Sequence, residues 1–320
     1  MKLSDYVETY ILEHDIADTT AEGYRYCVSG FERWHGRPIE IESDLTTDLA
    51  NQWLTWLKSV GRSTHTCKSR RGELLTLWRA ARRDRRIDFD KDPEFVRRVR
   101  TDELDPECFT HEQAGLLLRQ CQDLTGTVGS LTIPRAIYFG SFVRAAWDSG
   151  LRLGDLLAFD EQTVDAIIQG QGSIRIRQSK SRRYVDCHFH PSTVEAIRKC
   201  WECVPRTSEI FGLFPPSLSG FGIQDRRSEL PTDRVWPQWS LDRKPWHREF
   251  KLVVESAGLR GGTKYLRRGA ATEAELLTPG SAARKLGHSP HSAGLAEKHY
   301  ISRKVLPMAP VVGRELSATS

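Results

Sequence analysis

Six side chains in the second half of this 320-residue chain have types and an order suited to phosphoryl transfer. In chain order they are Arg152, Lys180, Lys264, Arg267, His288 and Tyr300. Cations stabilise the non-bridging oxygens of a phosphodiester in the transition state, a lysine can protonate the leaving oxygen, and a tyrosine hydroxyl can attack phosphorus. Such a set would transfer a phosphodiester onto a protein hydroxyl without a metal ion.

The first arginine, Arg152, lies among leucines in the segment Ser149-Gly-Leu-Arg-Leu-Gly-Asp-Leu-Leu-Ala158. An arginine alone is usually exposed or ion-paired. Because the leucines bury this segment, its guanidinium needs a partner or a ligand. We expect a helix over Leu151–Phe159 with Arg152 near its start. Asp155, on the next turn, could orient the guanidinium for phosphate binding, and we expect it to be structural rather than catalytic.

Lys180 lies in a polar turn between two alternating segments, Ser173–Arg177 and Tyr184–His188. This pattern predicts a β-hairpin with Lys180 at or near its tip, inside a strand-like region from Gln162 to Phe189. Basic hairpin tips are often merely solvated. Arg182 and Arg183 are alternative phosphate contacts, but only the lysine readily gives up a proton.

Lys264 and Arg267 are one turn apart on a helix expected over Thr263–Leu277. Small residues follow them, so the helix can pack closely and hold the arginines in place. Arg268 beside them is expected to be structural or to contact backbone phosphate. His288 follows Leu-Gly and is expected on a loop, with His291 as the alternative, and Tyr300 is the only tyrosine after it.

These stretches resemble the tyrosine recombinase, or phage integrase, family. In that family the first arginine sits in G-L-R-x-x-E/D-L-L, the second in H-x-x-R, and the nucleophilic tyrosine follows L-G-H. The usual histidine before the second arginine is Lys264 here. A lysine at this position is also similar to type IB topoisomerases, which share the catalytic fold.

The resemblance implies a mainly α fold with a small β-hairpin or sheet: a helical, SAM-like core-binding domain and a mixed α/β catalytic domain. It implies cleavage and rejoining of double-stranded DNA through a 3′-phosphotyrosyl intermediate, by a homo-tetramer on two DNA sites. Tyr300 would be the nucleophile and Lys180 the acid, while Arg152, Arg267 and His288 would bind the phosphate with help from Lys264. The alternatives are a topoisomerase IB-like relaxase and a catalytically inactive DNA-binding relative.

Composition and the positions of helix-ending glycines and prolines predict a helical domain at 1–87, a charged linker at 88–107 and a catalytic domain at 108–320. Hydroxyl caps predict the helix starts in the first domain: Thr19 with Glu22 as a capping box, Leu45–Asp48, and Ser63–Thr66. Another capping box at Thr110 and a helix ending at Gly150 open the catalytic domain.

The net charge of +5 is small, but the basic residues are unevenly distributed. Between residues 62 and 86 the chain carries many arginines and few acids, which indicates a phosphate-facing surface. The alternative is a solvated helix face, which is the usual meaning of a run of charges. The residues expected to bind DNA there are Lys68, Arg70, Arg71, Arg79 and Arg82. In the catalytic domain they are Arg182, Arg183 and Arg268.

Several classes of protein are disfavoured. We find no apolar stretch long enough to span a bilayer, no secretory signal and an odd number of cysteines, which favours a cytoplasmic, DNA-associated protein. Cys200 and Cys203 lack partners at zinc-site spacing, so we expect two packed helix cysteines. Because no Walker loop or metal-binding carboxylate pattern occurs, no ATP, metal or other cofactor is expected.

Overall fold

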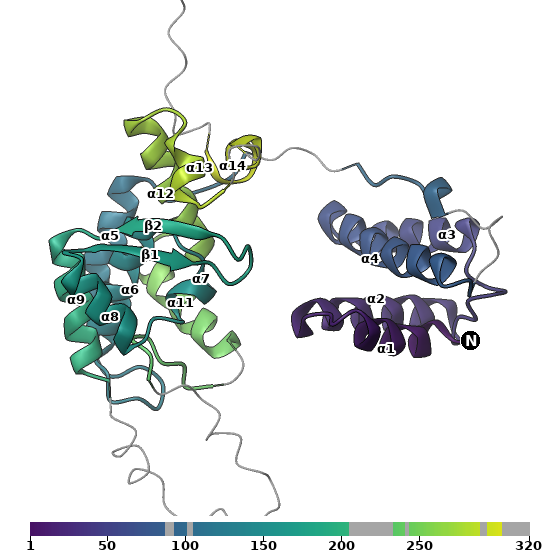
Figure 1. Cartoon of the computed structure of the whole chain (residues 1–320), viewed down its shortest axis with the longest axis horizontal. Coiled ribbons are helices and arrows are strands. Elements are labelled where there is room, and N and C mark those ends of the chain that lie inside the picture. Colours follow the sequence, from purple (N-terminus) through teal and green to yellow (C-terminus); the bar gives the residue numbers. More distant parts are fainter. Residues whose placement is uncertain (87–92, 101–104, 205–232, 241–242, 289–292, 303–320) are drawn as a thin grey trace, which may run out of the picture. The chain divides into compact units, whose positions relative to one another are not determined.

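The computed structural model describes residues 1–86, 93–100, 105–204, 233–240, 243–288 and 293–302. The chain forms two compact units, Met1–Leu104 and Asp105–Ser320 (Figure 1). Within the described residues the fold is mainly α-helical with one two-stranded sheet, as the sequence predicts.

The first unit is a bundle of helices with an aromatic core. Its elements are α1 (Leu3–Glu13), α2 (Asp18–His35), α3 (Thr47–Ser59), α4 (Thr64–Arg83) and the short 3₁₀ helix η1 (Pro93–Phe95). Trp53 and Trp78 are fully buried among leucines, which agrees with a structural role for the tryptophans. The side chain of Ser63 caps α4 by accepting from the amide of Thr66. The expected Thr19 capping box is wrong, because α2 begins at Asp18 without a side-chain cap.

The residues between the two domains divide between the units. Val96 is buried in the core of the first unit, and η1 packs on α4. On the other side, the amide of Phe109 donates to the carbonyl of Tyr265 at 3.3 Å. The boundaries 1–87, 88–107 and 108–320 stay a prediction.

The second unit is built around α6, which packs against helices from both ends of the domain. Its elements are α5 (His111–Gln122), α6 (Arg135–Ser149), α7 (Leu153–Leu156), α8 (Glu161–Gln169), β1 (Ser173–Arg177), β2 (Tyr184–His188), α9 (Pro191–Glu202), α11 (Lys244–Ser256), α12 (Thr263–Leu277), α13 (Ser281–Lys285) and α14 (Ala293–Tyr300). Neighbours of α6 include α5, α9 and α12. The predicted capping box at Thr110 and the left-handed Gly150 at the end of α6 are confirmed.

The hairpin is antiparallel, with Ser173 opposite His188 and Arg177 opposite Tyr184 (Figure 1). The strand-like reading from Gln162 onward is wrong at its start, because Glu161–Gln169 is helix α8. Asp160 caps this helix by accepting from the amide of Thr163 at 3.0 Å. The buried Val164 and Ile167 are three positions apart, which is helical spacing.

Other predictions have mixed outcomes. The helix expected over Leu151–Phe159 is only the four-residue α7, and Arg152 is its extended N-cap residue. Cys200 is buried on α9, but Cys203 follows the helix as its C-cap residue and is only half-buried, so the prediction of two packed helix cysteines is confirmed for Cys200 alone. None of the helices described is long and apolar enough to cross a membrane.

Candidate active site

Arg267 is a buried cation held by the carboxyl ends of two other helices. Its side chain projects from α12, is only 4% exposed, and donates to the carbonyls of Gly150, after α6, and Leu286, after α13. The distance to the Leu286 carbonyl is 3.2 Å. Carbonyls at helix C-termini carry partial negative charge, so they stabilise a guanidinium there. Burial, and next the charge of Arg152, lower the pKa of Arg267 to about 10.

Arg152 reaches the same place from α7 through a glutamine. Its Nη1 donates to Oε1 of Gln178 at 2.6 Å, and Nε2 of Gln178 donates to the Leu286 carbonyl at 3.0 Å. Gln178 is fully buried. The Leu286 carbonyl therefore connects the two arginines, since Arg267 donates to it directly and Arg152 is joined to it through Gln178. Two positive charges are thus brought together in a partly buried site. Such a pair suits a doubly negative transition state.

Tyr300 is the last residue of α14, and its half-buried ring faces both Arg267 and His288. The guanidinium carbon of Arg267 lies 5.2 Å from the centroid of the Tyr300 ring. The His288 ring lies 5.3 Å away, centroid to centroid, at an angle of 72°. Helix α14 is held to α12 and α13 by a small apolar cluster that includes Ala271 and Ala296. The tyrosine is thus supplied to the site by its own chain.

The charges around Tyr300 favour its phenolate. Burial alone would raise the pKa of Tyr300, but the positive charges of Arg267, Arg152 and Lys264 outweigh burial and hold this pKa below its ordinary value of 10.0. Burial, together with Arg267 and Arg152, lowers the pKa of His288. A lowered pKa favours the neutral form of His288, and a neutral imidazole can donate or accept a hydrogen bond without adding charge.

Lys180 is exposed on the loop between β1 and β2, and the residues beside it tie the loop to the site. Ser181 Oγ donates to Oε1 of Gln178 at 2.8 Å. Asp155 corrects our expectation: its Oδ1 accepts from the amide and hydroxyl of Ser179 at 2.9 and 2.7 Å, and its Oδ2 has no hydrogen-bond partner among the described residues, so the carboxylate does not bind the Arg152 guanidinium. Asp155 therefore holds the loop, and the guanidinium of Arg152 is oriented by Gln178.

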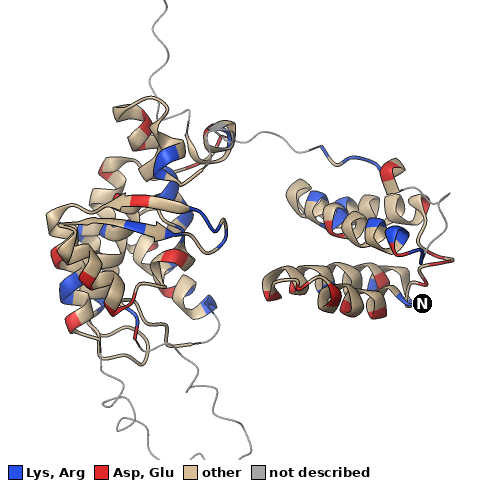
Figure 2. Ribbon diagram, in the orientation of Figure 1, with Lys and Arg blue, Asp and Glu red and all other residues tan. Residues whose placement is uncertain are grey.

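The remaining cations divide between exposed and structural positions. Lys and Arg gather on the β1–β2 loop and on α12 (Figure 2). Lys264 is exposed in the first turn of α12, and Arg182 and Arg183 are exposed on the loop. Arg268 donates to the carbonyls of His299 and Glu107, both at 3.1 Å, so it joins the end of α14 to α12. His291, the alternative to His288, lies outside the described residues.

Sequence reasoning missed Gln178 and the two carbonyls that hold Arg267. A glutamine beside a hairpin turn has no distinctive spacing, and backbone oxygens carry no sequence signal. The one signal in the sequence was that Gln178 is close to the candidate residue Lys180. The structure brings Arg152, Arg267, His288 and Tyr300 together, with Lys264 close enough to affect the pKa of Tyr300.

In the first unit, several of the expected DNA-binding cations have partners within the protein. Arg70 pairs with Glu73 at 2.6 Å and lies over the ring of Tyr26. Arg71 donates to the carbonyls of Val96 and Arg97 at 2.7 and 2.8 Å. Arg79 pairs with Glu94, Arg82 is half-buried, and Lys68 is exposed. Within this unit, the charged side chains of α4 are mainly basic and those of α1 are mainly acidic (Figure 2).

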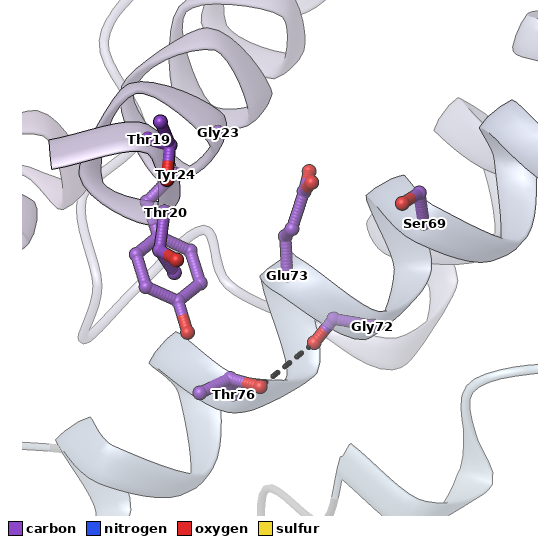
Figure 3. Close-up of a pocket in the computed structure, with 8 residues that line it drawn as sticks. All are labelled: Thr19, Thr20, Gly23, Tyr24, Ser69, Gly72, Glu73 and Thr76. Atoms are coloured by element: carbon purple, nitrogen blue, oxygen red, sulfur yellow. Dashed lines mark hydrogen bonds between the residues drawn. The ribbon is translucent and has the colours of Figure 1, made fainter. Parts of the chain in front are cut away.

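A pocket in the first unit lies between α2 and α4 (Figure 3). It is lined by threonines, glycines, a serine, Tyr24 and Glu73, and the carboxylate of Glu73 already pairs with Arg70. The hydroxyl of Thr76 donates within its own helix, to the carbonyl of Gly72 at 2.9 Å. None of the six candidate catalytic side chains belongs to this unit.

Comparisons with known proteins give structural matches only. No family model and no curated sequence matches the chain. A lambda integrase fragment, solved as a dimer bound to a COC′ core site, matches with a TM-score of 0.67 and 18% identity over 98% of this chain and 100% of that chain. The Tn1549 transposon integrase, solved with transposon right end DNA, matches with a TM-score of 0.64 and 14% identity over 92% of this chain and 93% of that chain.

A lambda integrase tetramer bound to a Holliday junction is also similar, with a TM-score of 0.63 and 19% identity over 92% of this chain and 76% of that chain. The likeness extends over nearly the whole chain in each case. It agrees with the mainly α fold and the small hairpin described above. The chain therefore has the fold of these solved integrases.

Proposed function

We propose that the protein is a tyrosine-type site-specific DNA recombinase that cleaves and rejoins DNA through a 3′-phosphotyrosyl intermediate. The proposal depends on one observation: Tyr300 lies close to Arg267, Arg152 and His288 in one site. The integrase fold of the chain, whose solved examples include DNA complexes, supports the choice of substrate.

In the proposed reaction the Tyr300 oxygen attacks the scissile phosphorus and loses its proton. The bond from phosphorus to the 5′ oxygen breaks, and Lys180 gives its proton to that oxygen. Arg152, Arg267 and His288 would bind the non-bridging oxygens, on which negative charge grows in the transition state. The phosphotyrosyl bond conserves the energy of the broken ester, so rejoining is the same reaction reversed with another 5′ hydroxyl.

The lowering of the Tyr300 pKa by nearby cations supports its role as nucleophile. A phenolate is a better nucleophile than a phenol, and the cations that lower this pKa would also contact the substrate phosphate. Once a phosphate enters, its negative charge opposes part of this effect. Before DNA binds, the positive charges make deprotonation of Tyr300 easier than it is for a tyrosine in water.

Exchange of strands needs two DNA sites and four tyrosines, so we expect four protomers to act together. The solved lambda integrase tetramer on a Holliday junction is the structural precedent for that assembly. A topoisomerase IB-like relaxase is the second candidate, favoured by Lys264 in place of the usual histidine. An inactive DNA-binding relative is the third.

The test is covalent trapping. Duplexes that bind the full chain would be selected from a randomised pool, nicked near the scissile position, and incubated with wild type. A denaturant-resistant protein–DNA adduct with a free 5′ hydroxyl is the expected result. Its absence would favour the inactive relative. An adduct with relaxation of supercoiled plasmid, but without exchange between two sites, would favour the relaxase.

A further inference from the structure

Gln178 is the buried residue that joins three separate parts of the site. Its Oε1 accepts from Arg152 at 2.6 Å and from the hydroxyl of Ser181 at 2.8 Å, and its Nε2 donates to the Leu286 carbonyl at 3.0 Å. These partners belong to the start of α7, the β1–β2 loop and the end of α13. All three side-chain contacts are made from a residue with no exposed surface.

The backbone of Gln178 also closes the loop that carries Lys180. Its amide donates to the carbonyl of Arg183 at 2.8 Å, and its carbonyl accepts from the amide of Arg182 at 2.9 Å. Arg182 has a left-handed backbone, with φ of 53°, as a tight turn requires. Side-chain and main-chain contacts of one residue therefore set where the loop stands relative to Arg152.

The turn before His288 is packed directly against the Gln178 amide. Gly287 has φ of 67°, and a Cβ there would lie 3.2 Å from Nε2 of Gln178 and 3.1 Å from Cβ of Val185. Gly287, which has no Cβ, lets the turn come this close to the Gln178 amide, and the hydrogen bond from Gln178 to the Leu286 carbonyl fixes the position of the turn. Since His288 is the next residue, its ring position depends on this turn.

We propose that Gln178 is a positioning residue that sets Arg152, the Lys180 loop and the His288 turn in one arrangement for cleavage. It acts through other side chains, so it is not itself catalytic. An amide suits this place because it accepts from a cation and donates to a carbonyl without adding charge. A carboxylate would neutralise the cations and face the Leu286 oxygen without a proton to give. This inference rests on the proposed function.

The experiment uses Gln178→Met, which keeps the length and apolar volume of the side chain but makes none of the three hydrogen bonds. Gln178→Glu keeps the acceptor and loses the donor. Gln162→Met, on the exposed surface of α8, is the matched control. Single-turnover adduct formation would be measured on a nicked selected duplex at saturating protein, with DNA affinity and thermal unfolding followed in parallel.

We expect Gln178→Met to slow adduct formation by about 10- to 100-fold, because small misplacements of reacting groups have effects of that order. DNA affinity should change less than threefold, and Gln162→Met should match wild type. A 5′-bridging phosphorothiolate substrate, which needs no proton donor, should restore only part of the Gln178→Met rate. The remaining defect would report the misplaced Arg152, which a sulfur leaving group does not bypass.

A rate equal to wild type in folded Gln178→Met overturns the positioning role while leaving the proposed function intact. So does full recovery with the phosphorothiolate, because only the loop of Lys180 would then depend on Gln178. If Gln178→Met does not fold, Gln178→Glu decides: a wild-type rate in that variant overturns the proposal. Absence of any adduct from wild type overturns the proposed function itself, and this inference with it.

Discussion

Arg267 on α12 faces Tyr300 at the end of α14, with the guanidinium carbon 5.2 Å from the centroid of the phenol ring. The arginine is buried and its position is fixed by backbone carbonyls, so its charge cannot move away from the tyrosine. The charge of Arg267 is the largest of those that lower the pKa of the tyrosine, and in the proposed reaction the same guanidinium would bind the phosphate that Tyr300 attacks.

The first prediction concerns the nucleophile. Tyr300→Phe should abolish the covalent adduct, because no other hydroxyl in the described part of the site is held between Arg267 and His288. Duplex binding should stay nearly intact, since phosphate contacts supply most of the affinity. Denaturing gels would measure the adduct and gel shifts the binding. Tyr184→Phe, an exposed tyrosine of β2, is the control. An adduct formed by the Tyr300→Phe variant would contradict the assignment.

The second prediction concerns pH. Since Lys264 helps to lower the pKa of Tyr300, Lys264→Gln should raise that pKa. The phenolate fraction at neutral pH then falls, and the rise in cleavage rate with pH should move to higher pH. Single-turnover rates from pH 6 to pH 10 at saturating protein would show the shift. Lys199→Gln, an exposed lysine of α9, should leave the profile unchanged. Identical profiles for wild type and Lys264→Gln would exclude this electrostatic role.

The third prediction concerns the proton donor. Lys180→Ala should slow cleavage of ordinary DNA, and general acid catalysis commonly contributes about 10²- to 10⁴-fold. A 5′-bridging phosphorothiolate should restore the rate, because sulfur leaves without protonation. Arg182→Ala and Arg183→Ala are the comparisons on the same loop, and neither should be rescued. Rescue of an arginine variant in place of Lys180→Ala would move the acid role along the loop.

The helices of this site were predicted from the sequence more accurately than the contacts between them. The capping box at Thr110, the glycine after α6 and the bounds of α12 follow from local chemistry, so they could be read directly. Helix α8 was missed because a short segment with few apolar residues fits strand and helix patterns alike.

The partner of Arg152 depends on tertiary structure and could not be predicted. Asp155 is nearest in sequence, yet the hairpin brings Ser179 to its carboxylate and Gln178 to the arginine. The roles of the first-unit arginines were obscured for the same reason. Their acidic and carbonyl partners, such as Glu94 and the backbone of Val96, lie outside the basic run.

The fourth prediction separates binding from structure in that basic run. Arg71→Gln should destabilise the first unit by about 1–2 kcal/mol, because a charged donor to two carbonyls is lost. Lys68→Gln should leave stability unchanged and lower the slope of log affinity against log salt by about one unit if Lys68 contacts a phosphate. Urea unfolding and salt titrations of binding would measure the two effects. An unchanged slope would make Lys68 an ordinary solvated lysine.

The fifth prediction concerns the close packing that holds Arg267 in place. A Cβ on Gly269 would lie 2.3 Å from the carbonyl oxygen of Phe109 and 2.5 Å from the ring of Trp147, so α12 or its neighbours must shift. Gly269→Ala should therefore lower the free energy of unfolding by about 1–3 kcal/mol, the usual effect of overpacking.

The same shift would move Arg267, two residues earlier on α12, relative to the Gly150 carbonyl that it contacts. Adduct formation per folded molecule should fall together with stability. Gly115→Ala is the matched control, because on α5 the added Cβ would meet only the flexible end of Arg119 at 3.8 Å. Alanine is a better helix former than glycine, so this control should be neutral or slightly stabilising. Equal stability and equal rates for the two variants would show that the added methyl group is accommodated without disturbing the site, and that close packing at Gly269 does not hold Arg267 in place.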